Sequence, residues 1–272
     1  MSADVLSRNN VQVLGSGDQP MLFAHGFGCD QNMWRFVTPA FADRYKIVLF
    51  DYVGSGQSDL TAYDPQRYSS LDGYAQDVLD ICEALDLRDV IFVGHSVSCV
   101  IGVLAANRAP DRFDRLIFIG PSASYINDAA ANYIGGFDRP DIEGLLEMMD
   151  KNYLGWASFL APAVMKNPGD PTLTAELEQS FCATDPKIAR RFAQVTFLSD
   201  NRADFGKLQV PSLIMQCSDD SIAPISAGEF LAREIPGSTF RQLRATGHCP
   251  HMSAPAETIE IINEYLAVPL AA

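Results

Sequence analysis

The chain has 272 residues, 47% of them hydrophobic and 20% charged, which is typical of a soluble protein with one large domain or two small ones. Its 34 acidic and 20 basic residues give a formal net charge of −14. Such a surface repels phosphate backbones and anionic headgroups, so we expect neither nucleic acids nor membranes as partners. The polar start "MSADVLSRNN" is unlike a signal peptide, and no apolar run reaches the roughly 18 residues of a membrane span.

The cysteines favour a reduced, cytoplasmic protein. They are scattered along the chain, without a C-x-x-C pair or the spacing of a metal site. We therefore expect mostly buried free thiols, no metal and no cofactor. The six are Cys29, Cys82, Cys99, Cys182, Cys217 and Cys249.

Seven short runs rich in β-branched residues predict strands. They are VQVLG (11–15), MLFAH (21–25), KIVLFD (46–51), VIFVG (90–94), LIFIG (116–120), SLIMQ (212–216) and TFRQL (239–243). Most are apolar throughout, as in a parallel sheet that is covered on both faces. Helical patterns over 71–85, over 97–107 and in "ETIEIINEYLA" lie between or after them, which predicts an α/β fold.

This alternation stops between 120 and 211, where no convincing strand is found. About four helices are predicted there, with Pro140, Pro162, Pro168, Pro171 and Pro186 at or near their starts and breaks. A helical insertion in an α/β pattern indicates a lid over the carboxyl ends of the strands, where open α/β sheets bind ligands. The alternative is a purely structural helical lobe.

The segment Gly94-His95-Ser96-Val97-Ser98 joins a predicted strand to a predicted helix. Ser96 at such a junction is either a helix N-cap or a nucleophile. The frame is close to the G-x-S-x-G nucleophile elbow, in which small residues allow a strained turn. Ser98 stands where the last glycine is expected; it is small enough to keep the turn.

Two further loops carry the groups that a nucleophilic serine needs, a histidine base and a carboxylate that orients it. Asp219 and Asp220 follow the strand predicted at 212–216, and either could be the acid. His248 and His251 follow the last strand, and His248 is favoured because it comes first, in a Gly-His step. The alternatives without a catalytic role are a solvated turn for the two aspartates and surface or packing positions for the two histidines. Three pieces in the order Ser, Asp, His, each after a strand, favour catalysis.

The early loop His25-Gly26-Phe27-Gly28 follows another predicted strand. Acyl transfer needs two backbone N–H groups to receive an oxyanion, and Phe27 and Val97 are the expected donors. A plain turn is the alternative. "GSGQS" (54–58) lacks the Lys-Ser/Thr ending of a phosphate loop and is interpreted as a structural turn.

These motifs resemble the RsbQ-like branch of the α/β-hydrolase superfamily, which also contains the plant karrikin and strigolactone receptors. The resemblance runs almost end to end, through "FGCDQ", "LFDYVGSGQSDL", "LDGYAQDVLD", "VGHSVS", "YINDAAANYIGGF", "MMDKNYLGWA" and "GHCPHMS". It implies a Ser96–His248–Asp220 triad, since the family's acid stands four residues before a proline, here Pro224. It also implies Phe27 and Val97 as oxyanion donors, an α/β-hydrolase core over 1–134 and 200–272, and a four-helix lid over 135–199.

The resemblance further implies a set of residues that face the ligand. This set is mostly aromatic and apolar and contains no lysine or arginine, so it suits a small hydrophobic ligand and offers no clamp for a carboxylate or phosphate. Packing between lid and core is the alternative for each member. The set is Phe27, His95, Tyr125, Phe137, Phe159, Phe197, Ile222 and Ala223.

We therefore expect a serine hydrolase of small hydrophobic esters or lactones, with butenolide-like compounds as the candidates that the resemblance implies. The alternative is an RsbQ-like signalling regulator that senses or hydrolyses a small hydrophobic ligand and acts on a partner, such as a PAS-domain phosphatase. A hydrolase fold used only for binding is a third reading, and the intact triad argues against it.

Overall fold

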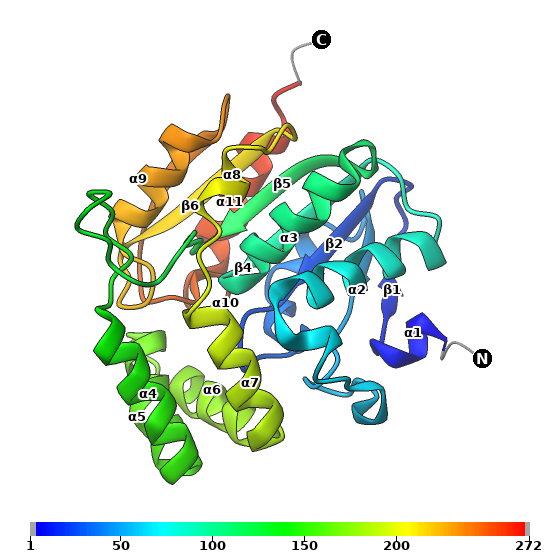
Figure 1. Ribbon diagram of the computed structural model, residues 1–272. Coiled ribbons are helices and arrows are strands. Elements are labelled where there is room, and N and C mark those ends of the chain that lie inside the picture. Colours follow the sequence, from blue (N-terminus) through cyan, green and yellow to red (C-terminus); the bar gives the residue numbers. More distant parts are fainter. Residues whose placement is uncertain (1–3, 270–272) are drawn as a thin grey trace.

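The computed structural model describes residues 4–269 and contains a seven-stranded sheet in the order β1-β3-β2-β4-β5-β6-β7 (Figure 1). β1 pairs antiparallel with β3, and all other neighbours are parallel. All seven predicted strands are present, so the predicted α/β fold is confirmed. The strands are β1 (Gln12–Leu14), β2 (Pro20–Ala24), β3 (Lys46–Leu49), β4 (Val90–His95), β5 (Phe113–Ile119), β6 (Ser212–Asp219) and β7 (Thr239–Thr246).

The strands in the middle of the sheet, from β2 to β5, are buried on both faces, which explains why they are mostly apolar, whereas the edge strands β1 and β7 are largely exposed or half-buried. Successive side chains point to opposite faces, so Met21 and Phe23 of β2 enter one hydrophobic cluster. Leu22 and Ala24 enter the other cluster, on the opposite face. All four side chains are fully buried.

Helices cover the two faces of the sheet. α2 and α3 pack on one face together with α9, and α10 and α11 pack on the other, behind the sheet in Figure 1. The core helices are α1 (Val5–Arg8), α2 (Leu71–Ala84), α3 (Val97–Arg108), α8 (Arg202–Phe205), α9 (Ile225–Glu234), α10 (Pro250–Ser253) and α11 (Pro255–Leu266). Short 3₁₀ helices lie at Gln31–Trp34, Thr38–Ala40, Leu60–Ala62, Arg67–Ser69 and Pro110–Arg112.

Four helices form a separate layer beyond one edge of the sheet, at the bottom of Figure 1. They are α4 (Arg139–Lys151), α5 (Tyr153–Met165), α6 (Pro171–Ala183) and α7 (Pro186–Phe197), and we call them the lid. Prolines open α6 and α7, where a missing N–H costs nothing. Pro162 differs from the prediction, because it lies inside α5, near its end. None of the helices between residues 4 and 269 combines the length and apolarity that crossing a membrane requires.

The strand order reverses between β2 and β4, which are neighbours in the middle of the sheet. Loops that leave the carboxyl ends of two such strands run in opposite directions and leave a crevice between them. The loop after β2 carries Phe27, and the loop after β4 carries Ser96. Sheet topology alone therefore brings these two predicted site segments together.

Candidate active site

Ser96 occupies a strained turn between β4 and α3, with φ 58° and ψ −124°. Non-glycine residues rarely adopt such angles unless the surrounding structure enforces them. The buried strand and helix do so here, and Gly94 provides room, because a Cβ at that position would lie 2.9 Å from the Ser98 backbone. The Ser96 side chain makes no capping bond to α3. Ser96 therefore stands at the N-cap position of α3, but its side chain does not cap the helix.

A chain of hydrogen bonds joins Ser96, His248 and Asp220. Ser96 Oγ lies 2.8 Å from His248 Nε2, and His248 Nδ1 lies 2.7 Å from Asp220 Oδ2. The three residues are 6%, 4% and 7% exposed, so water competes little with these bonds. Because a carboxylate only accepts, Nδ1 carries the proton and the Nε2 lone pair faces the Ser96 hydroxyl. This is the arrangement that removes a proton from an attacking serine.

The two candidate acids have different surroundings. Asp220 Oδ1 accepts hydrogen bonds from the backbone N–H groups of Ile222 and Ala223, at 2.8 and 3.1 Å, which leaves Oδ2 for His248. Asp219 is the last residue of β6, and its carboxylate pairs with Lys166 at 2.6 Å on the surface. The geometry thus places Asp220, and not Asp219, on the imidazole.

The last turn of α5 is bonded directly to the loops that carry His248 and Asp220. Carbonyl groups at a helix C-terminus have no partner within the helix. Here Val164 O accepts from the His248 backbone N–H at 2.7 Å, and Ala163 O accepts from Ser221 Oγ at 2.5 Å. Lys166 O accepts from Thr246 Oγ1 at 3.3 Å. The lid therefore contributes to the position of the imidazole.

The loop after β2 lies against the nucleophile. A Cβ added at Gly26 would stand 2.5 Å from His95 Nδ1 and 3.3 Å from Ser96 Cβ, so only glycine fits there without a shift. The Val97 N–H belongs to the first turn of α3, where N–H groups lack intrahelical partners and the helix dipole favours negative charge. Phe27 and Val97 thus lie on the two segments that meet at Ser96, and their role as oxyanion donors stays a prediction.

Ser98, which replaces the last glycine of the elbow, is fully buried and joins three segments. Its hydroxyl donates to the carbonyl oxygen of His25 at the end of the β2 strand. The Tyr52 hydroxyl, which follows β3, lies 2.9 Å from Ser98 Oγ and donates to it. The exchange of glycine for serine thus adds a link between the elbow and the loop that holds Phe27.

A small cavity lies above Ser96, between the sheet edge and the lid. It leaves about 30 Å³ for the centres of water molecules and has no lysine or arginine in its wall. Four of the residues predicted to face a ligand line it: Phe27, His95, Phe197 and Ile222. Tyr125 is buried with its hydroxyl 3.3 Å from Ser96 Oγ. The rest of the wall comes from Cys29, Ser96, Leu160, Val164, Leu177, Phe181, His248 and Cys249.

Three predicted lining residues lie elsewhere. Phe159 is 60% exposed, because successive residues of a helix are about 100° apart and α5 turns Leu160 inward instead. Phe137 is half-buried in a β-bridge with Ile126 and lies outside the cavity wall. Ala223 acts through its backbone N–H on Asp220.

Sequence reasoning missed several residues of the wall. Leu177 and Phe181 stand four positions apart on α6, so their spacing could have identified an inward-facing stripe. Cys29 and Cys249 flank predicted site residues, but nothing in their spacing marks them as cavity residues.

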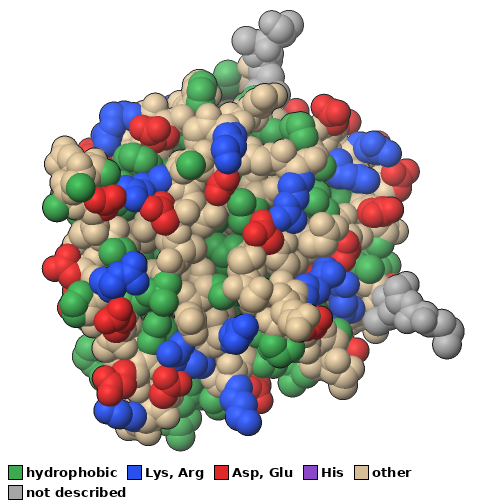
Figure 2. Space-filling view, viewed as in Figure 1, with side chains coloured by type: hydrophobic (Ala, Val, Ile, Leu, Met, Phe, Trp, Pro, Cys, Tyr) green, Lys and Arg blue, Asp and Glu red, His purple; other side chains and the backbone are tan. Residues whose placement is uncertain are grey.

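All four histidines are buried, and none is visible on the face in Figure 2, where acidic and basic side chains are interspersed. Burial lowers the pKa of His25 and His95, and it lowers the pKa of His251 to about 3. These three rings are therefore neutral at pH 7. Burial also raises the pKa of Tyr125, so its hydroxyl near Ser96 remains protonated.

Comparison with known proteins identifies the family. Residues 19–255 match the family described as alpha/beta hydrolase fold. The chain is 37% identical to the Karrikin insensitive 2 receptor CA of Petunia hybrida, over 95% of each chain. It is 38% identical to the Strigolactone esterase RMS3 of Pisum sativum, over 94% of this chain and 96% of that protein.

Solved structures of similar proteins support the same family assignment. A hydrolase from Oleispira antarctica is 44% identical and superposes with a TM-score of 0.95, over 98% of this chain and 97% of the other. An enol-lactonase from Burkholderia xenovorans, at 19% identity and a TM-score of 0.81 over 95% and 96% of the two chains, shares the fold. The chain therefore belongs to the α/β-hydrolase fold family, in the branch that contains the karrikin and strigolactone receptors.

Proposed function

We propose that this hydrolase cleaves small hydrophobic esters or lactones through Ser96, His248 and Asp220. The observation that carries the proposal is the continuous hydrogen-bond chain from Ser96 Oγ through the imidazole to Asp220 Oδ2, at 2.8 and 2.7 Å. Proton transfer along these hydrogen bonds needs no cofactor. The strained backbone at Ser96 supports the same role, because it presents the hydroxyl at the crevice.

The reaction proceeds in two acyl-transfer steps. Ser96 Oγ attacks the carbonyl carbon while His248 Nε2 takes the hydroxyl proton, and the N–H groups of Phe27 and Val97 stabilise the oxyanion. His248 then gives the proton to the leaving alkoxide, which in a lactone stays attached to the acyl chain. Water then attacks the acyl carbon and gives a proton to His248, and His248 returns that proton to Ser96 Oγ as the bond from Oγ to the acyl carbon breaks and the acid leaves. The sum is one ester and one water giving an acid and an alcohol.

The cavity wall supports the substrate class. It is apolar apart from the site itself and contains no cationic side chain, so it favours uncharged ligands. At about 30 Å³ it is far smaller than the roughly 300–1,000 Å³ of ordinary ligand sites, so larger substrates require the lid helices to move outward. The relative from pea is a strigolactone esterase by name, and a butenolide is therefore a suitable test substrate.

Ser96→Ala tests the proposal with p-nitrophenyl acetate and a fluorogenic butenolide as substrates. Loss of the serine of a triad lowers kcat by roughly 10⁶-fold. Ser238→Ala, at a serine on the segment before β7, is the control and keeps the wild-type rate. A Ser96→Ala protein that remains folded and hydrolyses both substrates at the wild-type rate would refute the proposal.

A signalling role is the second candidate, and the contact between the lid and the base favours it. Because Val164 O binds the His248 backbone N–H, an acylated Ser96 that displaces His248 also pulls on α5. The lid surface could then report the ligand to a partner, such as a PAS-domain phosphatase. The test is binding of that phosphatase to wild type and Ser96→Ala, with and without butenolide. Phosphatase binding that is the same with and without butenolide, and the same in wild type and Ser96→Ala, would contradict this role.

A further inference from the structure

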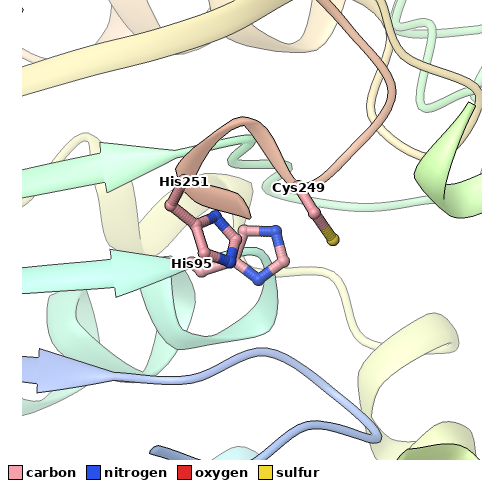
Figure 3. A group of neighbouring side chains, drawn as sticks. All are labelled: His95, Cys249 and His251. Atoms are coloured by element: carbon pink, nitrogen blue, oxygen red, sulfur yellow. The ribbon is translucent and has the colours of Figure 1, made fainter. Parts of the chain in front are cut away.

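Three metal-ligating side chains meet behind the nucleophile. His95 ends β4, Cys249 lies in the turn after β7, and His251 belongs to α10 (Figure 3). One ligand atom from each can be chosen so that all lie within 4.8 Å of one another. All three side chains are at least 98% buried. The fold thus brings together three residues whose spacing in the sequence does not form a metal-binding motif.

The two imidazoles have unused hydrogen-bonding atoms. Neither ring nitrogen of His251 has a partner among the described residues, and His95 Nδ1 has none either. His95 Nε2 lies 2.7 Å from the His248 carbonyl oxygen, so it carries the proton and Nδ1 has a free lone pair. An unsatisfied buried polar atom costs roughly 1–3 kcal/mol. Packing of His251 between Trp34 and His95 does not satisfy these atoms.

We propose that His95, Cys249 and His251 bind one soft or borderline divalent cation, with Zn²⁺ as the test ion. Imidazole and thiolate together are the ligands that Zn²⁺ prefers. Bonds of roughly 2.0–2.3 Å place tetrahedral donors about 3.3–3.7 Å apart, so limited side-chain rotations close the site. Gly26 leaves space beside His95 Nδ1 that any Cβ would fill.

The cavity above Ser96 gives the ion its entry path. His95 and Cys249 both line it. Binding replaces the Cys249 S–H bond with a bond from sulfur to the metal, and the proton leaves to solvent. One thiolate leaves a net charge of +1 at the site.

Ion binding has a consequence that rests on the proposed function. His95 is bonded to the His248 carbonyl oxygen, and Cys249 is the next residue in the chain. When His95 and Cys249 move toward a bound ion, they therefore shift His248 and draw its imidazole away from Ser96. We expect Zn²⁺ to inhibit ester hydrolysis reversibly, with activity restored by EDTA.

The closing experiment measures binding without reference to activity. Metal-free full-length protein is titrated with Co²⁺, followed by thiolate-to-cobalt charge-transfer absorption, and Zn²⁺ competition then gives the Zn²⁺ affinity. We expect one ion per chain. Cys249→Ser and His251→Gln each weaken Zn²⁺ binding by roughly 100-fold or more, because loss of even an outer partner costs 10–100-fold. Cys182→Ser, at the exposed thiol on α6, is the control and keeps the wild-type affinity.

Two results would overturn the site. One is the absence of a charge-transfer band in the folded wild-type protein. The other is a band that persists in Cys249→Ser with unchanged affinity, while thermal unfolding shows that this variant is folded. A protein that binds Zn²⁺ at this site but cleaves no ester even after EDTA has removed the ion would refute the proposed function and leave the metal site intact.

Discussion

The loops at the carboxyl ends of the strands and the lid helices form two sides of the same cavity, and different interactions keep each side in place. Ser96 is fixed by backbone structure, because β4 and α3 are almost wholly buried and force its unusual φ. The lid is held by side chains and by helix ends, such as Val164 O on the His248 N–H and Arg35 on Glu176. The reactive groups are therefore preorganised on the rigid side, and the size of the cavity is set on the adjustable side.

This difference is consistent with how each region presents its residues to solvent. The strands of the sheet centre are buried on both faces, whereas each lid helix buries only one stripe. A change at the sheet edge should therefore alter the chemistry, and a change in the lid should alter stability and ligand size. The predictions below test that division, from the largest expected effect to the smallest.

The adjacent aspartates give the sharpest comparison. Asp220→Asn removes the acceptor that holds the Nδ1 proton of His248, and such a change lowers kcat by roughly 10⁴-fold. Asp219→Asn breaks only a surface ion pair with Lys166, and kcat stays near the wild-type value. Steady-state hydrolysis of p-nitrophenyl acetate measures both. Equal losses in the two variants would mean that the lid contact, and not the carboxylate on His248, controls the base.

Neighbouring residues of α5 provide the matching test in the lid. Leu160 faces the cavity and is 6% exposed, so Leu160→Ala lowers the free energy of unfolding by about 2–5 kcal/mol. Phe159 points to solvent, so Phe159→Ala changes the free energy of unfolding by less than about 0.5 kcal/mol. Urea unfolding compares the two. If Phe159→Ala also alters KM, the larger residue folds back over the cavity, contrary to the present arrangement.

The buried histidines make stability depend on pH. The His251 pKa is about 3 in the folded chain and 6.5 when unfolded, so below pH 6.5 only the unfolded chain gains this proton. The contribution is fully present above pH 6.5 and is lost as pH falls toward 3. Between pH 7.5 and 5 it amounts to about 2 kcal/mol. Urea unfolding at both pH values should show a smaller drop in His251→Gln than in wild type, and an identical drop would contradict the lowered pKa.

The ion pair between lid and core is expected to matter least. Arg35 meets Glu176 of α6 with two bonds of 2.7 and 2.6 Å, but both side chains are about one-third exposed. Solvent screening limits such pairs, so Glu176→Gln should cost about 0.5–1 kcal/mol, less at high salt. Glu147→Gln breaks the Lys151 pair within α4 and is the control. If both variants show the same small loss, Arg35 does not anchor the lid.

Much of the site follows from local sequence. Short β-branched runs predict all seven strands, and those in the middle of the sheet are mostly apolar because both of their faces are covered. The small residues around Ser96 and the Gly-His step at His248 mark the turns after β4 and β7. The topology of a parallel sheet then carries these turns to one edge, so their meeting could be expected before any coordinates.

Tertiary structure decided the rest. Phe159 and Leu160 are neighbours of similar hydrophobicity, and only the rotation of α5 against the core turns one outward and the other inward. Asp219 and Asp220 are equivalent by composition, and only the end of β6 separates a surface carboxylate from the partner of His248. The meeting of His95, Cys249 and His251 also has no local signature. Spacing along the chain encodes the period of an element, whereas the direction of a side chain depends on how that element packs.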